Sequence, residues 1–172
     1  MGIDIYAKWR DQTKEEKEDQ CTGFSTVSGD VGYLREAYHG SPYVTKYLLT
    51  EAFEAENCEA QIDAETLEER LPVAVLMALY REKTIYEGKE SPVLEFSELM
   101  PALNEIFANQ VDNTDHELIA SLIKDKDILE LAKTMIKERS LPDYALAFVD
   151  FVALCKKKEE EQGEPCTVYA SY

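Results

Sequence analysis

The residue types best suited to binding or to acid–base chemistry gather in one stretch, residues 31–48. This stretch holds four of the chain's 10 tyrosines, one of its two histidines, and the bases Arg35 and Lys46. Basic side chains donate hydrogen bonds to anionic groups, and tyrosine is common in binding surfaces because it combines apolar area with a hydroxyl. The candidate ligand- or partner-binding residues here are Tyr33, Arg35, Tyr38, His39, Tyr43 and Lys46.

Local signals divide this stretch into two elements. Residues 31–39 suit a short helix, on which Arg35 and His39 would be i,i+4 neighbours. Pro42 interrupts that helix, and residues 43–49 are compatible with either a strand or a second helix. The stretch also fits a purely structural role, in which its apolar side chains belong to the core and its charges are solvated.

The two ends of the chain both carry strand patterns. Residues 3–9 alternate between apolar and polar side chains, and residues 166–172 alternate again. Because one isolated strand is not stable, the two are predicted to pair with each other. Asp4 lies within the first of them and is a further site candidate. It either faces water from an edge strand or, on a buried face, needs a partner such as Arg35 or His39.

Between these strands, apolar periodicity and capping signals predict five or six helices. Asp63 begins one that runs to about Tyr86, with Pro72 able to interrupt it. The other predicted N-caps are Thr13, Ser97, Thr114, Asp127 and Ser140. The helix after Ser140 is the expected central core helix, and His116 is expected at the surface.

These patterns predict an α+β fold that is predominantly helical. It is a helical bundle with a small antiparallel sheet that pairs the N- and C-terminal strands. With 172 residues, the chain is long enough to bury a core and is expected to form a single globular domain over residues 1–172.

The chain is strongly acidic. It carries 35 acids against 18 bases, a net charge of −17. Nucleic acid and anionic membrane surfaces are therefore unlikely partners on charge grounds, because both are bound through lysine and arginine. A basic protein partner, a cation or simply high solubility agrees with this balance.

Sequence motifs point to no cofactor and no metal. Phosphate-loop, dinucleotide-binding, zinc-protease and serine-hydrolase signatures do not occur. The four cysteines are too widely spaced for a structural zinc site, although a pairing of Cys155 with Cys166 stays open. The acidic run 112–117 lacks the glycine and the distal glutamate of a calcium loop. With no signal peptide and no apolar run long enough to span a bilayer, the expectation is a cytoplasmic protein with reduced thiols.

Two segments near the N-terminus, MGIDIYAKW at residues 1–9 and GYLREAYHG at residues 32–40, resemble those of an uncharacterised family of small bacterial proteins. The resemblance covers about the first quarter of the chain. It implies a bacterial cytoplasmic origin, and it brings no known activity with it.

Two functions from different classes fit these observations. The first is a non-catalytic binding protein that engages another protein, such as a basic one, through the tyrosine-rich stretch or through an acidic surface. The alternative is an enzyme or a small-ligand-binding protein that acts on an anionic substrate. In that case Arg35, His39 and the tyrosines would hold the substrate, and Asp4 or Glu36 would orient it or exchange protons.

Overall fold

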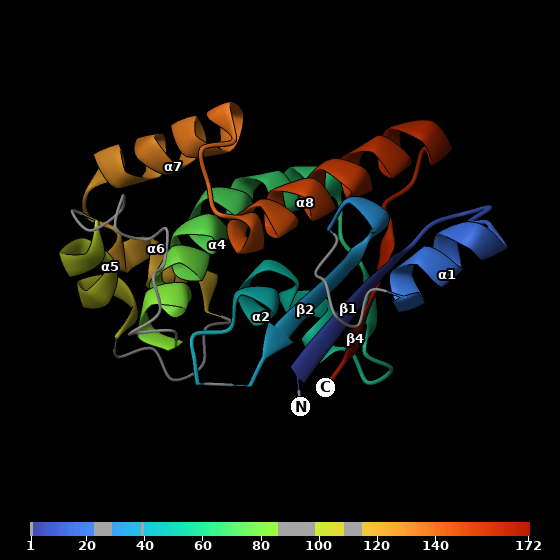
Figure 1. Ribbon diagram of the computed structural model, residues 1–172, viewed down its shortest axis with the longest axis horizontal. Helices are drawn as coiled ribbons and strands as arrows, with labels where there is room; N and C mark the ends of the chain where they lie inside the picture. The colour runs from blue at the N-terminus through green and yellow to red at the C-terminus, as the bar shows by residue number, and fades with distance from the viewer. Residues whose placement is uncertain (1, 23–28, 39, 86–98, 109–114) are drawn as a thin grey trace.

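The predicted α+β class is confirmed by the computed structural model, which describes residues 2–22, 29–38, 40–85, 99–108 and 115–172. Helices cover one face of a four-stranded antiparallel sheet with the strand order β2-β1-β4-β3 (Figure 1). The strands are β1 (Gly2–Lys8), β2 (Tyr33–Ala37), β3 (Glu59–Gln61) and β4 (Thr167–Ser171). The strands from the two chain ends are neighbours, as predicted, and the two termini lie close together.

The helices are α1 (Lys14–Thr22), α2 (Val44–Leu48), α3 (Thr50–Glu54), α4 (Ala64–Ile85), α5 (Met100–Phe107), α6 (His116–Leu122), α7 (Lys126–Glu138) and α8 (Asp143–Gln162). A short 3₁₀ turn, η1 (Gly29–Val31), precedes β2. Within the described residues, no helix combines the length and the apolar character needed to cross a membrane.

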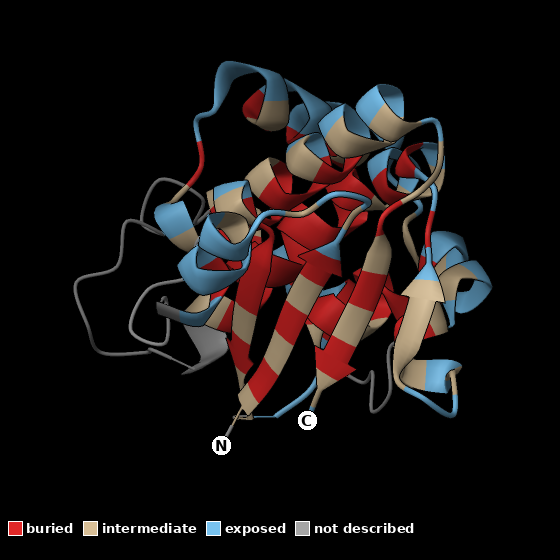
Figure 2. Cartoon of the chain, turned by 90° about the vertical axis from the view of Figure 1, so that its right-hand side faces the viewer, coloured by how far each residue is buried: buried red, intermediate tan, exposed pale blue. Residues whose placement is uncertain are grey.

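Alternation along β1 separates a buried face of the sheet from an outer face (Figure 2). Ile3, Ile5 and Ala7 are fully buried beneath the helices. On the outer face, Asp4 pairs in register with Arg35 of β2, and the neighbouring positions are Tyr6 of β1, Tyr33 of β2 and Tyr169 of β4. The N-terminal strand is therefore central in the sheet and is not an edge.

The predicted helix over residues 31–39 is wrong. Residues 33–37 form β2, which pairs along its whole length with β1. A helix of two turns is marginal by itself, whereas pairing with β1 supplies backbone hydrogen bonds. It also places Leu34 and Glu36 on the buried face and Arg35 on the outer one. The nearby alternative of a helix after Pro42 is confirmed by α2.

Helix α4 runs through Pro72 without a break. Proline in a helix interior costs about 3 kcal/mol because it removes a backbone donor and crowds the preceding turn. The turns that follow bury Leu76, Met77 and Leu79 completely, and each such side chain contributes roughly 2 kcal/mol. Burial against α8 therefore outweighs the local cost. Helix α8 buries Phe151, Val152 and Cys155 in return and is the predicted core helix.

Two of the predicted N-caps are confirmed. Thr13 and Glu16 form a reciprocal capping box, with Thr13 N donating to Glu16 Oε2 at 2.8 Å and Glu16 N donating to Thr13 Oγ1 at 3.1 Å. Asp63 Oδ1 accepts from Thr66 N at 2.8 Å. Both signals are local, because the cap and its donor lie three residues apart in the chain.

Other predicted caps are wrong by one or two residues. Asp125 caps α7 in place of Asp127, whose own N–H it accepts. Asp115 caps α6 by accepting from Leu118 N. Helix α8 begins after Pro142 with no side-chain cap, so Ser140 does not have that role. Where several acceptors are adjacent, spacing alone does not select one. The two remaining predicted caps, Ser97 and Thr114, lie outside the described residues.

Gly29 marks a close approach between η1 and α8. A Cβ atom at this position would overlap the carbonyl oxygen of Ala147 and would lie 2.9 Å from the backbone N of Phe151. We expect Gly29→Ala to lower the free energy of unfolding by about 3 kcal/mol, because backbone must move to relieve the overlap.

Urea denaturation measures this difference, and Gly163→Ala is the matched control. Gly163 has a positive φ of 74° but nothing within 4 Å of its Cβ position, so alanine there costs only about 1 kcal/mol of backbone strain. Equal losses in the two variants would show that η1 and α8 are not in close contact.

Candidate functional site

The fold separates the tyrosine-rich stretch into two environments. Tyr33 and Arg35 lie on the outer face of the sheet, whereas Tyr38, Tyr43 and Lys46 lie where the chain passes from β2 into α2. His39, the remaining predicted residue of the stretch, lies outside the described residues.

Asp4 brings together the outer-face candidates. Tyr33 Oη donates to Asp4 Oδ1 at 2.7 Å, and Arg35 Nη1 lies 3.5 Å from the same oxygen. Arg35 is thus one of the partners expected for a partly buried aspartate. The Tyr6 ring packs on the Tyr33 ring with 5.3 Å between centroids. Burial, reinforced by the hydrogen bond to Asp4, raises the pKa of Tyr33 to about 12.

Tyr47 on α2 is a core residue, with 5% of its surface exposed. Burial raises the pKa of its phenol to about 12 as well. Its ring packs against the His116 ring at 4.6 Å. His116 Nε2 lies 2.6 Å from Tyr47 O and 3.3 Å from Thr50 Oγ1. His116, which was expected at the surface, is half-buried in the first turn of α6, and its ring joins α6 to the α2–α3 junction.

The raised pKa values of Tyr33 and Tyr47 predict that the protein loses stability at alkaline pH. Their folded pKa values of about 12 exceed the unfolded value of about 10, so the folded chain binds more protons in this range. The free energy of unfolding should therefore fall as pH rises from about 10 to about 12, by roughly 1–2 kcal/mol for each tyrosine.

Urea denaturation across this pH range tests the effect. Tyr33→Phe and Tyr47→Phe should each make the decline shallower than in the wild type. Tyr172→Phe is the control, because it removes a phenol that is 58% exposed. An unchanged decline in the double variant Tyr33→Phe/Tyr47→Phe would show that these two phenols do not cause the loss of stability.

Tyr43 is held by cations as well as by a ring. Lys46 Nζ lies 5.3 Å and the Arg81 guanidinium carbon 4.9 Å from its ring centroid. Tyr38 meets it edge-on at 5.7 Å. Tyr43 is therefore packed between side chains of α2, α4 and the end of β2.

Glu36 and Arg81 form a buried ion pair that sequence reasoning did not find. Their side chains are 6% and 7% exposed, and Arg81 Nε lies 3.2 Å from Glu36 Oε2. Glu36 also accepts from Val44 N at 2.8 Å, from Thr45 N at 3.1 Å and from Thr45 Oγ1 at 2.6 Å. Glu36 therefore caps α2 from strand β2. The local N-cap residue, Tyr43, provides no side-chain cap. Burial raises the pKa of Glu36, and Arg81 opposes that rise.

The guanidinium of Arg81 also donates to the carbonyl oxygens of Ala37, Gly40 and Pro42. One side chain from α4 thus holds three backbone groups of the connection between β2 and α2. This geometry assigns Glu36 and Arg81 a structural role, and the stretch they organise has its polar groups turned inward.

Glu36→Gln should lower the free energy of unfolding by about 3 kcal/mol, because it leaves a buried guanidinium without its counter-charge and turns an amide N–H₂ toward donors. Chemical denaturation measures the loss. Glu51→Gln is the matched control: Glu51 pairs with Arg70 at 2.6 Å but is 42% exposed, so its removal should cost less than about 1 kcal/mol. Similar losses would argue against a special role for the buried pair.

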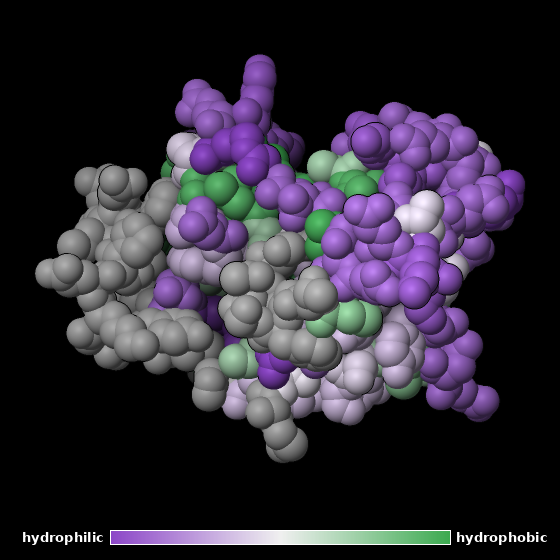
Figure 3. All heavy atoms as spheres, turned by 45° about the vertical axis from the view of Figure 1, so that its right-hand side comes forward, coloured by the Kyte–Doolittle hydropathy of each residue, from purple (hydrophilic) through white to green (hydrophobic). Residues whose placement is uncertain are grey.

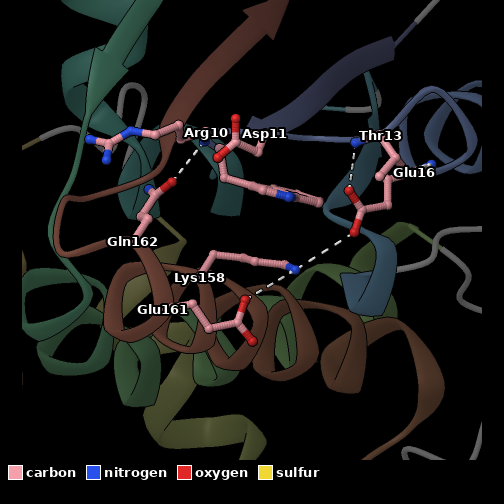
Figure 4. Close-up of a pocket in the computed structure, with 8 residues that line it drawn as sticks. Arg10, Asp11, Thr13, Glu16, Lys158, Glu161 and Gln162 are labelled. Atoms are coloured by element: carbon pink, nitrogen blue, oxygen red, sulfur yellow. Dashed lines mark hydrogen bonds and ion pairs between the residues drawn. The ribbon is translucent and has the colours of Figure 1, made fainter.

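A hollow of about 370 Å³ lies where the end of β1, the start of α1 and the end of α8 meet (Figure 4). Its lining residues are Trp9, Arg10, Asp11, Thr13, Glu16, Lys158, Glu161 and Gln162. Lys158 Nζ lies 5.0 Å from the centroid of the Trp9 ring, 3.7 Å from Glu16 Oε1 and 3.3 Å from Glu161 Oε2. The hollow therefore already holds one cation between carboxylates and an indole.

A second hollow of about 210 Å³ adjoins the first and shares Trp9, Arg10 and Gln162 with it. It reaches Lys8 and Glu59, which face each other as an ion pair at the end of the sheet. We call the two hollows together the Trp9 surface. Figure 3 shows mainly hydrophilic residues over α1 and the end of α8, the helices that border it.

The charges of the first hollow favour a positive guest. Three carboxylates, those of Asp11, Glu16 and Glu161, face two cations. Arg10 is already paired with Glu164 at 2.6 Å, and Asp11 has no ion pair within the described part of the chain. The pKa of Glu16 is lowered by its hydrogen bond from the Thr13 backbone and further by Lys158, so its carboxylate stays charged.

The Trp9 surface was not predicted from the sequence. In the alternating pattern of residues 3–9, Trp9 is simply the last apolar position. The available signal was that the chain has one tryptophan and that it stands at a strand end beside a base and an acid. Within the described residues, no group of three or more histidine, cysteine, aspartate or glutamate side chains could hold a metal ion.

Comparisons of the chain with protein-family models, with curated proteins and with solved structures find no match. This outcome is consistent with the resemblance to an uncharacterised family without known activity. Function is therefore inferred from the geometry of this chain alone.

Proposed function

We propose that this is a non-catalytic binding protein of the bacterial cytoplasm that holds a basic segment of a partner protein on the Trp9 surface. The observation that carries the proposal is the arrangement around Lys158. A lysine ammonium lies over the Trp9 ring and between two carboxylates. Indole faces and carboxylates attract ammonium and guanidinium groups in the same way when these come from another chain.

The first hollow has room and charge for such a guest. Its volume of about 370 Å³ lies within the range of side-chain and small-ligand pockets. Asp11 and Glu161 are both exposed at its border, so a guest arginine can approach them without displacing a buried group. Trp9 supplies the aromatic area that often anchors an interface.

The acidic stretch around α3 and β3 extends this surface. Glu59 lines the second hollow, and Glu54, Glu56, Glu65 and Glu69 are exposed with no ion pair among the described residues. A net charge of −17 attracts a basic chain from a distance and speeds its association. An extended basic segment can thus contact Trp9 and continue toward these glutamates.

The tyrosine-rich stretch supports a separate ligand site less well. Tyr47 and Glu36 are buried, and Tyr33 and Arg35 both contact Asp4. The polar groups that an anionic substrate would need are engaged within the protein. For this reason the proposal places binding at the Trp9 surface and not between Tyr33 and Tyr47.

The single tryptophan allows a direct test by fluorescence. Titration of the wild type with a hexa-arginine peptide should give a saturable change in Trp9 emission. The Asp11→Asn/Glu161→Gln variant should bind roughly fivefold more weakly, because two carboxylates at the hollow contribute about 0.5 kcal/mol each. Glu16 is left unchanged because it also caps α1.

Glu105→Gln/Glu117→Gln is the matched control, since it removes the same charge at exposed positions on α5 and α6, which lie at the opposite end of the molecule from α1 in Figure 1. It should weaken binding less than about twofold. Hexaglutamate should produce no change in emission. Equal weakening in the two double variants, or a titration that does not saturate, would show unspecific attraction and would sink the proposal.

A further inference from the structure

Cys155 and Cys166 meet where the end of α8 leads into β4. Both are free thiols, and each is 1% exposed. Cys166 Sγ donates to the carbonyl oxygen of Cys155 at 3.8 Å, so the side chain of one residue lies against the backbone of the other. Each thiol is also the largest influence on the pKa of the other. The two cysteines are therefore in contact across the turn that joins α8 to β4, which is the placement that a disulfide between them needs.

The two sulfurs are not equivalent. The Cys155 thiol lowers the pKa of Cys166, and the Lys158 ammonium acts in the same direction. The Cys166 thiol, together with burial, raises the pKa of Cys155. Cys166 is therefore the sulfur that more readily becomes a thiolate, and the thiolate is the form that reacts with oxidants. Cys155 remains a protonated thiol beside it.

We propose that Cys155 and Cys166 form a peroxide-sensitive dithiol that closes reversibly to a disulfide. The Cys166 thiolate attacks one oxygen of hydrogen peroxide, which gives a sulfenic acid and releases hydroxide. Cys155 then attacks the Cys166 sulfur, its thiol proton leaves, and the sulfenic oxygen departs as water. In total, two thiols and one peroxide give one disulfide and two waters. Peroxide is a suitable oxidant for buried sulfurs because it is little larger than water.

The disulfide would close a ring that contains the last turns of α8 and Gly163. Lys158, Glu161 and Gln162 lie inside this ring, and all three line the first hollow. Oxidation would thus tie one wall of the Trp9 surface to the central strand β4. The dithiol stands on its own contacts, and it does not depend on what the Trp9 surface binds.

The experiment uses the full chain with Cys21→Ser/Cys58→Ser, which removes the exposed and the half-buried thiol and leaves the pair. The reduced protein is treated with hydrogen peroxide, then denatured, alkylated and analysed by intact mass and peptide mapping. We expect loss of both free thiols, a mass lower by two hydrogens, and a cross-linked Cys155–Cys166 peptide. Dithiothreitol should return both thiols.

Single variants in the same background test the order of the steps. Cys155→Ser should let Cys166 accumulate as a sulfenic acid that dimedone traps, whereas Cys166→Ser should give several-fold less trapping at Cys155. Circular dichroism confirms that each variant is folded. Oxidation to sulfinic acid without cross-linking, a disulfide between two chains, or two thiols that resist peroxide in the folded protein would overturn the proposal.

Discussion

The fold depends on how one buried charge is satisfied. Glu36 points from the sheet into the helical layer, where an isolated carboxylate would be very unfavourable. Arg81 of α4 neutralises it, and the N-terminus of α2 donates two backbone N–H groups to it. Since Arg81 also holds three carbonyl groups of the connecting segment, the pair fixes how β2, α2 and α4 sit together. Strand, loop and helix therefore take their positions from one interaction.

Around that pair, the chain forms a helical layer and a sheet. Helices α4 and α8 pack against each other and bury Leu76, Met77 and Phe151 completely, and the strands from the two chain ends form the middle of the sheet. The outer face of the sheet keeps its polar groups and tyrosines. Charged side chains at the ends of β1 and α8 meet beside Trp9 and border a hollow without disturbing the core. The hollow thus lies at the ends of these elements and outside the packed core.

The same junction joins the two proposals in space. The end of α8 supplies Lys158 and Glu161 to the first hollow, and Cys155 and Cys166 bracket the segment that carries them. A redox change in the dithiol would act on the backbone of that segment, whereas a basic guest would act on its side chains. The two effects are chemically separate, because one is the oxidation of two thiols and the other is electrostatic binding of a basic segment. Either can therefore be present without the other.

The sequence by itself determined the α+β class, the pairing of the terminal strands and the caps at Thr13 and Asp63. These follow from alternation, periodicity and contacts three residues apart, which are all local. Only the tertiary structure decided that residues 33–37 are a strand, that Glu36 meets Arg81, and that Trp9 meets Lys158. The partners in these contacts come from distant parts of the chain. Their free energy arises from burial and charge pairing across elements, which no local pattern records.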